Sequence, residues 1–255
     1  MCNQPPWFSD NSFQTFLLEG KDMLLLSNPS SNPKIKKSND LYGLEATVLH
    51  LAPANLSGFE VCGGRSKGCT DGCLFKSGMA RVFRKVPESR IRKTQELFEN
   101  PELFKARLRM DLSYMVRRGA RRKKRVAARL NGTSDIKWEE KFPELFDEFS
   151  SVQFWDYTKL RSRFLRYLNG ELPKNYHLTW SLSENNLDFS LDMLKRGRNV
   201  AAVFEKLPKK YMGIPVSNAD KHDFRFLERQ TGRWLGLLPK GVAKQDETGF
   251  VVRDM

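Results

Sequence analysis

Apolar residues recur along the chain in short blocks that alternate between two periodicities. Some blocks are apolar, β-branched runs with the length of buried strands. These runs lie at residues 44–52, 125–132, 152–158, 175–183, 199–205, 213–220 and 233–241. Between them, apolar residues at helical spacing predict helices within 92–120, 142–149, 159–168 and 187–197, with Pro101 starting a second helix inside the first segment. Strand and helix therefore alternate along most of the chain.

This alternation predicts an α/β fold in which parallel strands are joined by right-handed crossovers. The favoured architecture is a complete or partial (β/α) barrel of about six or seven mainly parallel strands, and an open doubly wound sheet is the second choice. Residues 1–40 are rich in Pro, Asn and Ser around the apolar run 16–26, and we expect a loosely ordered N-terminal arm there. Residues 41–255 are expected to form a single α/β domain with a three-cysteine loop at 62–73.

The excess of basic residues indicates a class of binding partner. The formal net charge is +14, which attracts polyanions such as nucleic acid or nucleotides. One group of cations lies within 81–93. A second group is a candidate nucleic-acid-binding segment and consists of Arg117, Arg118, Arg121, Arg122, Lys123, Lys124 and Arg125. A solvent-exposed helix end, where cations complement the helix dipole, is the alternative interpretation.

The chain also lacks the sequence signals of membrane insertion or export. No apolar run approaches the roughly 18 residues of a membrane span, and no basic segment followed by an apolar stretch begins the chain. We therefore expect a cytoplasmic protein with no membrane partner. The oligomeric state has no signature in the sequence.

Polar residues follow nearly every predicted strand. The carboxyl ends of parallel strands share one edge of the sheet, where active sites of α/β folds collect. Capping of the next helix is the structural alternative for single residues such as Ser183. The candidates to line a pocket at this edge are Asn131, Ser134, Asp135, Asp156, Lys159, Ser183, Glu184, Asp220 and Asp223.

Three cysteines follow the first predicted strand. Six residues separate Cys62 from Cys69, three separate Cys69 from Cys73, and glycines surround them. Disulfides rarely persist in the cytosol, so the thiols favour a metal: zinc with a fourth ligand from elsewhere, or a [4Fe–4S] cluster with one open iron. Three reduced thiols without a metal are the alternative. The histidines that could complete a zinc site, and the cations expected to lower the thiol pKa values, are His50, His177, His222, Arg65, Lys67 and Lys76.

Several strings resemble one family. They include LYGLEATVLHLAPANLSGFEVCGGRSKGCTDGCL, RLNGTSDIKWE, FWDYTK, HLTWSLSE and NVAAVFE. Together they are similar to the gene-product-88-like proteins of bacteriophages, over roughly residues 41–252. The resemblance implies a phage or prophage origin, and hence the cytoplasm of an infected or lysogenic bacterium, but no reaction.

More distantly, the layout resembles the radical S-adenosylmethionine enzymes, in which the first strand of a partial barrel leads into a three-cysteine loop. That resemblance implies that Cys62, Cys69 and Cys73 bind a [4Fe–4S] cluster and that the methionine moiety of S-adenosylmethionine occupies the fourth iron. The spacing of the cysteines differs from that superfamily, and LNGTSD stands where its glycine-rich cofactor motif would be.

Two functions follow as hypotheses. The first is an iron–sulfur enzyme that acts on a nucleotide or nucleic acid. The second is a nucleic-acid-binding protein with a structural zinc site and no catalysis, whose basic segments contact phosphates. Trp155, Tyr157 and Trp180 are candidates to stack on bases, although packing in the core is favoured for all three. A phage factor that inhibits a host protein would leave no recognisable signature.

Overall fold

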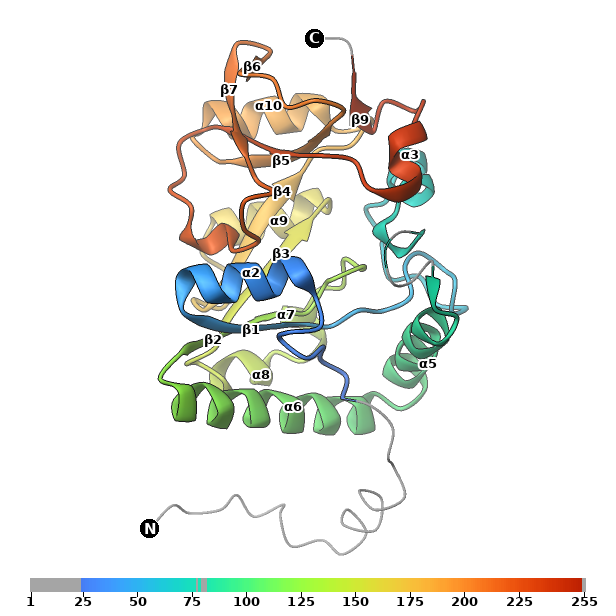
Figure 1. Ribbon diagram of the computed structural model, residues 1–255, viewed down its shortest axis with the longest axis vertical. Coiled ribbons are helices and arrows are strands. Elements are labelled where there is room, and N and C mark those ends of the chain that lie inside the picture. The colour runs from blue at the N-terminus through green and yellow to red at the C-terminus, as the bar shows by residue number, and fades with distance from the viewer. Residues whose placement is uncertain (1–23, 77, 79–81, 254–255) are drawn as a thin grey trace, which may run out of the picture.

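The computed structural model describes residues 24–76, 78 and 82–253, which form a mixed sheet with helices on both faces (Figure 1). The strands are β1 (Leu44–Val48), β2 (Arg125–Arg129), β3 (Gln153–Thr158), β4 (Tyr176–Ser181), β5 (Val200–Phe204), β6 (Lys210–Tyr211), β7 (Ile214–Asn218), β8 (Trp234–Leu237) and β9 (Val251–Val252). Their order is β1-β2-β3-β4-β5-β8-β7-β6, and β9 pairs with β5. Only β6 and β7 pair antiparallel among these strands. The predicted α/β fold with mainly parallel strands is confirmed.

Each predicted helical segment contains a helix of the structure. The described helices are α2 (Pro33–Tyr42), α3 (Lys67–Asp71), α5 (Lys85–Glu99), α6 (Pro101–Arg122), α7 (Trp138–Lys141), α8 (Glu144–Glu148), α9 (Arg161–Leu168) and α10 (Leu187–Lys195), with short 3-10 turns η2 (Leu74–Lys76), η3 (Arg225–Leu227) and η4 (Gly241–Gln245). Pro101 begins α6 as predicted, because proline fits the first turn of a helix, where its missing N–H is not needed. Phe104, Leu108, Leu112 and Met115 recur at helical spacing and are buried against the sheet.

Side chains alternate between two faces of the sheet. In β3, Phe154 packs into the large core under α5 to α10, whereas Trp155 packs on the opposite face with Ile35 of α2 and with Phe224. Figure 1 shows α2 in front of the sheet and α9 and α10 behind it. Because β1 to β5 follow one another in sheet order, right-handed crossovers place their connecting helices on one face.

The sheet is open, so the predicted closure into a barrel is wrong. The outward-facing backbone groups of β1 already have partners. Ala46 N donates to Asn39 Oδ1 at 3.0 Å, and Val48 N donates to Ser27 Oγ at 3.1 Å. Val48 O accepts from Ser27 N at 2.9 Å. No backbone group at these positions of β1 is left to receive a further strand, and the far end of the sheet turns back in the β6–β7 hairpin.

The predicted arm of residues 1–40 differs from the structure in its second half. Residues 1–23 lie outside the described residues. From Pro33 the chain forms α2, which begins at the N-cap Asn32 and ends at Gly43, whose φ of 63° is left-handed. Its buried side chains are Ile35, Ser38 and Asn39. Residues 33–40 therefore belong to the domain and cover one face of the sheet.

Asn39 is predicted to anchor α2 to β1. Replacing Asn39 by Ala removes the partner of the buried Ala46 N–H, and we expect the free energy of unfolding to fall by about 1–3 kcal/mol. The neighbouring Asp40→Ala serves as the control, because Asp40 makes only an exposed pair with Lys36, worth less than about 1 kcal/mol. Urea titration measures both variants. Equal losses would contradict the anchoring role.

Candidate functional site

Polar residues after β2 and β3 form a buried network instead of an open pocket. Asn131 donates from its backbone N to Asp156 Oδ1 at 2.7 Å and from Nδ2 to Asp156 Oδ2 at 3.0 Å. Asn131 Oδ1 accepts from Ser134 Oγ at 2.8 Å and from Trp138 Nε1 at 3.1 Å. Asn131 and Asp156 are both buried. These contacts fasten the loop after β2 to the end of β3.

Arg163 of α9 lies at the centre of the network and is fully buried. Its Nε and Nη2 donate to the two carboxylate oxygens of Glu139 at 2.9 and 2.7 Å. Its Nη1 donates to Asp135 Oδ1 at 2.9 Å, and Nη2 also donates to the Tyr176 hydroxyl at 2.6 Å. That hydroxyl in turn donates to Asp156 Oδ2. Because every carboxylate here is engaged by a cation or by a hydrogen-bond donor, the network is structural.

Sequence reasoning missed Arg163 and Glu139. Both lie in short amphipathic helices, where charged residues are usually solvated. The sequence holds no signal that singles out Arg163, because α9 contains three arginines and only the structure shows that Arg163 is buried while Arg161 is exposed.

Lys159 joins the network through its backbone. Lys159 N and Thr158 Oγ1 donate to Asp135 Oδ2 at 2.8 and 3.0 Å. The Lys159 ammonium lies 5.7 Å from the centre of the Phe250 ring. Its side chain therefore points to the β9 segment and away from the buried carboxylates.

Ser183 and Glu184, which follow β4, have capping and clamping roles. Ser183 N donates to Asn186 Oδ1 at 2.9 Å just before α10. Glu184 accepts from Ser66 Oγ at 2.6 Å and from Gly68 N at 2.7 Å. The Glu184 carboxylate thus holds the first turn of α3, which carries Cys69. In the structure Ser183 thus contacts the start of α10 and Glu184 fixes the cysteine loop, and a pocket lined by these two residues stays a prediction.

Asp220 and Asp223 lie apart from the other predicted pocket residues. Lys34 of α2 approaches Asp220 at 3.5 Å and Asp223 at 3.3 Å, and Arg129 of β2 approaches Asp223 at 3.3 Å. Burial alone would raise the pKa of Asp223, but Lys34, Arg129 and Arg225 hold it below its usual value. These carboxylates fasten α2 across the sheet face opposite the helical core. The structure therefore does not bring all predicted pocket residues to one rim.

The three cysteines are free thiols in a loop held to the network. Cys62 Sγ accepts from Ala54 N at 3.4 Å and donates to Thr133 O at 3.7 Å. Burial raises the pKa of Cys62 to about 12, and the neighbouring thiols Cys73 and Cys69 add to the rise. Burial also raises the pKa of Cys73.

The thiol pKa values of Cys62 and Cys73 are raised and not lowered, because burial outweighs the lowering effect of Lys159 and Arg90 on Cys73 and no cation is among the causes of the shift at Cys62. The cations near the loop are occupied by other partners. Arg65 pairs with Glu60 at 3.0 Å, and Lys67 pairs with Asp71 at 2.6 Å. Lys76 Nζ donates to Asp71 O at 3.3 Å. Buried neutral thiols are poor nucleophiles and must lose protons before they can bind a metal.

The cysteine loop does not form a metal-ligand set as it is arranged. Within residues 24–76, 78 and 82–253, no group of three or more Cys, His, Asp or Glu side chains is placed to hold a metal ion. His177 Nδ1 lies 3.0 Å from the Tyr167 hydroxyl, and the His222 ring packs edge-on against Tyr42. A ligand set would require Cys62 to exchange its contacts with Ala54 and Thr133 for the metal.

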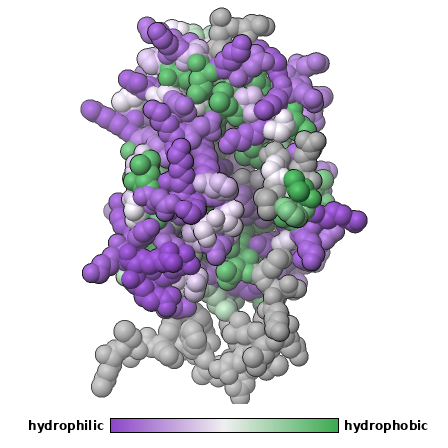
Figure 2. All heavy atoms as spheres, in the orientation of Figure 1, coloured by the Kyte–Doolittle hydropathy of each residue, from purple (hydrophilic) through white to green (hydrophobic). Residues whose placement is uncertain are grey.

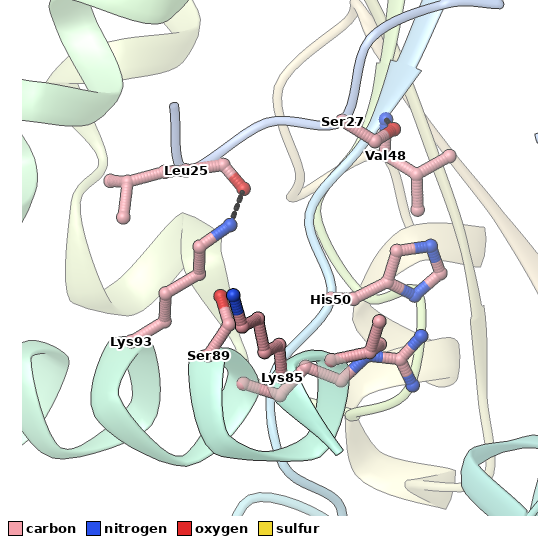
Figure 3. A pocket seen from close by; sticks show the side chains of 9 residues that line it. Leu25, Ser27, Val48, His50, Lys85, Ser89 and Lys93 are labelled. Atoms are coloured by element: carbon pink, nitrogen blue, oxygen red, sulfur yellow. Dashed lines mark hydrogen bonds between the residues drawn. The ribbon is translucent and has the colours of Figure 1, made fainter. Parts of the chain in front are cut away.

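A cavity of about 260 Å³ opens beside the carboxyl end of β1. Figure 3 shows Lys85, Ser89 and Lys93 rising from α5 toward the chain segment that carries Val48 and His50. Arg90 also lines the cavity. Sequence reasoning missed this site, because the predicted helix began at residue 92 and did not include the first turns of α5. The available signal was the helical spacing of four polar residues: Lys85, Ser89, Arg90 and Lys93.

The predicted nucleic-acid-binding segment lies at the opposite edge of the sheet. α6 carries the chain from the carboxyl edge back to the amino edge over 22 residues, or about 33 Å. Arg118 and Arg122 pair with the buried Glu45 of β1, the latter at 3.5 Å, and so are not free to bind a ligand. The cations of this segment that pair with no described carboxylate are Arg117, Arg121, Lys123, Lys124 and Arg125. Figure 2 shows hydrophilic residues gathered at its lower left, where α6 ends.

Comparison with known proteins identifies a family. A family model described as Gene product 88 matches residues 23–254. Neither the search of curated proteins nor the search of solved structures gave a match. Among the described helices, none combines the length and hydropathy that a bilayer-spanning segment requires. The comparisons therefore supply a family and no reaction.

Asp156 gives the network a pH dependence that can be measured. Burial raises the pKa of Asp156 to about 6, although Arg163 and Arg129 oppose the rise. Between about pH 4 and 6 the folded state then holds a proton that the unfolded state has lost, so stability falls as pH rises through this window. We expect the stability advantage of the native protein over Asp156→Asn to shrink by about 2 kcal/mol from pH 4 to 7.

Denaturant titrations of both proteins at each pH give this difference. Asp192→Asn is the control, because Asp192 makes only an exposed pair with Arg196 and should show no such trend. An advantage that grows toward neutral pH would show instead that the network binds the carboxylate more strongly than water does.

Proposed function

Since the chain belongs to the phage gene product 88 family, whose description names no reaction, we propose its function from its own surface: it binds nucleic acid through the basic end of α6. The observation that carries the proposal is a set of five neighbouring cations without a carboxylate partner among the described residues. We call them the α6 patch: Arg117, Arg121, Lys123, Lys124 and Arg125.

The backbone concentrates these charges. α6 ends at Arg122, and Lys123 follows in a left-handed conformation with φ of 54°, so the chain turns sharply into β2 at Arg125. Residues 117–122 of the helix rise about 9 Å. Duplex DNA carries about five phosphate charges over that length. The α6 patch contributes Arg117 and Arg121 over that length, and Lys123, Lys124 and Arg125 follow directly after the helix, so the patch presents its charges to several successive phosphates.

Glu45 supports the same proposal because it determines which cations of this segment have a carboxylate partner. It is buried and engages Arg118 and Arg122 with its single negative charge, so the five cations of the α6 patch are the members of the segment that have no carboxylate partner among the described residues. Unpaired like charges repel one another, and a polyanion relieves that repulsion by replacing small counterions. The formal net charge of +14 acts in the same direction at long range.

Base stacking has no support in the structure. Trp155 and Trp180 are buried in the core, and the Tyr157 ring is covered by the Arg129 guanidinium 4.7 Å from its centre. The favoured core interpretation of the two tryptophans is confirmed. Binding through the α6 patch should consequently read phosphates and not base sequence.

Removing the α6 patch should reduce both affinity and its salt dependence. The test variant replaces Arg117, Arg121, Lys123 and Arg125 by Ala and leaves the cations that pair with Glu45 in place. Each lost phosphate contact lowers the slope of log K against log salt by about 0.9, so the slope should become shallower by about 3 to 4. Fluorescence anisotropy with a labelled duplex, over a series of salt concentrations, measures this slope.

A control variant removes exposed cations elsewhere. Lys206, Lys209 and Lys210 lie in the connection between β5 and β7, and their replacement by Ala should leave the slope close to that of the native protein. If both variants lose the same affinity and slope, attraction is a property of the overall charge. The α6 patch would then not be a binding site.

The metal hypotheses from the sequence are separate from this proposal and stay predictions. The loop of Cys62, Cys69 and Cys73 keeps the thiols close enough that Cys69 helps to raise the pKa of both Cys62 and Cys73, and Glu184 holds the loop in place. A [4Fe–4S] cluster, with S-adenosylmethionine at its open iron, or a zinc ion requires rearrangement of that loop. No step of the proposed binding depends on either group.

Elemental analysis and visible spectra of anaerobically purified protein test these predictions. If the loop binds a cluster, the protein contains iron and is coloured, and both properties vanish when Cys62, Cys69 and Cys73 are replaced by Ala. Stoichiometric zinc without colour would support the structural alternative. A reconstituted protein with neither metal would remove both predictions.

A further inference from the structure

The geometry points to a binding site for a phosphate monoester in the cavity beside β1. The cavity has a volume of about 260 Å³ and is enclosed by α5 on one side and by the end of β1 on the other (Figure 3). It is separate from the α6 patch, because α6 carries the chain about 33 Å from one edge of the sheet to the other. The inference therefore does not depend on nucleic-acid binding at that patch.

One wall of the cavity is cationic. Lys85, Arg90 and Lys93 project from α5, and the nine residues that line the cavity, all of them described, include no carboxylate. Lys93 Nζ donates to Leu24 O at 2.9 Å and to Leu25 O at 2.8 Å, which leaves a third N–H for a ligand. The positive charge of this wall is thus without an acidic partner inside the cavity.

Two buried nitrogen atoms at the cavity have no hydrogen-bond partner among the described residues. They are His50 Nδ1 and Arg90 Nη1. A buried polar atom without a partner is costly, so native proteins usually satisfy it with protein, water or ligand. The Arg90 guanidinium also lies 5.6 Å from the centre of the Phe75 ring, which holds its orientation. An oxygen-rich ligand would supply the acceptors that these groups lack.

The electrostatics of the cavity favour an anion with more than one charge. Burial, followed by the charges of Arg90 and Arg129, lowers the pKa of His50 to about 3, so the imidazole is neutral at pH 7. Burial lowers the pKa of Lys93 to about 8, and the ammonium is still mostly protonated there. Three cations therefore face the cavity from α5. A phosphate monoester carries about 1.5 to 2 negative charges and three acceptor oxygens, whereas a carboxylate carries one charge and two oxygens.

The first turn of α5 contributes to the same preference. α5 is 15 residues long and begins at Lys85, which lines the cavity together with Val86. The helix dipole favours an anion at this end, whereas Val86 N and Glu88 N already donate to Phe83 O and Arg84 O and Pro87 has no N–H. Arginine then adds a planar fork of donors that matches phosphate oxygens. The start of α5, the Arg90 guanidinium and the His50 imidazole therefore border the same cavity.

Cavity size limits how much of the ligand enters. Cavities that enclose drug-sized ligands have volumes of roughly 300–1,000 Å³, and this one is slightly smaller. The remaining walls are apolar and come from Leu25, Val48 and Val86. The cavity therefore suits a phosphate and the carbon atoms next to it, as in the sugar of a mononucleotide or the terminal nucleotide of a 5′-phosphorylated strand.

Calorimetric titration of the full-length protein tests the site. Inorganic phosphate is the first probe, followed by a nucleoside 5′-monophosphate and by the same nucleoside without phosphate. We expect saturable binding of both phosphate compounds and none of the nucleoside. Arg90→Met should weaken binding by about tenfold or more, since hydrogen bonds to charged groups contribute about 1.5–3 kcal/mol. Arg92→Met is the matched control, because Arg92 is exposed on the same helix and does not line the cavity.

A second variant distinguishes loss of binding from loss of folding. Lys85 is exposed at the start of α5, so Lys85→Met should keep the native fold and still weaken phosphate binding. Comparison of oligonucleotides with and without a 5′-phosphate then distinguishes a strand end from a free nucleotide as the source of the phosphate. The inference is overturned if the native protein shows no saturable phosphate binding, or if Arg90→Met and Arg92→Met weaken it equally. Neither result would bear on duplex binding by the α6 patch.

Discussion

The carboxyl edge of the sheet depends on one buried cation. Arg163 donates hydrogen bonds to Glu139 and Asp135 and reaches Asp156 through the Tyr176 hydroxyl, so it connects α9 with the exits of β2 and β3 and with β4. A buried ion pair contributes little net stability, but loss of one partner leaves an uncompensated charge that costs about 3–5 kcal/mol. The cysteine loop relies on the same network, because Asp135 N donates to Val61 O at 2.8 Å beside Cys62.

Much of the fold follows from local periodicity. Strand and helix positions were predictable because buried strands are apolar in runs and helices bury one face. α2 was not predictable in this way, since two of its three buried residues, Ser38 and Asn39, are polar and accept hydrogen bonds from Asp223 N and Ala46 N, outside the helix. The open form of the sheet could not be predicted from local sequence patterns either. It depends on Ser27 and Asn39 reaching the outer edge of β1, and no periodicity encodes that contact.

The sequence was equally limited in predicting how the side chains of the candidate sites are paired. The polar residues after β2 and β3 do gather at one edge, because parallel strands end together. Whether a carboxylate is free depends on its partner, and partners such as Arg163 for Asp135 lie far away in sequence. The cations at the end of α6 were visible in the sequence, but their division into paired and unpaired members depends on Glu45, more than 70 residues earlier.

The pairing of the outer edge of β1 has a consequence for self-association. An exposed edge strand offers a row of unpaired N–H and C=O groups that can recruit a strand from another molecule and so begin aggregation. Here Ser27 and Asn39 occupy the outward-facing groups of Val48 and Ala46. At the opposite end, β6 is only two residues long. Neither end of the sheet therefore provides a long template for strand addition, which protects the protein from polymerising through its own β-structure.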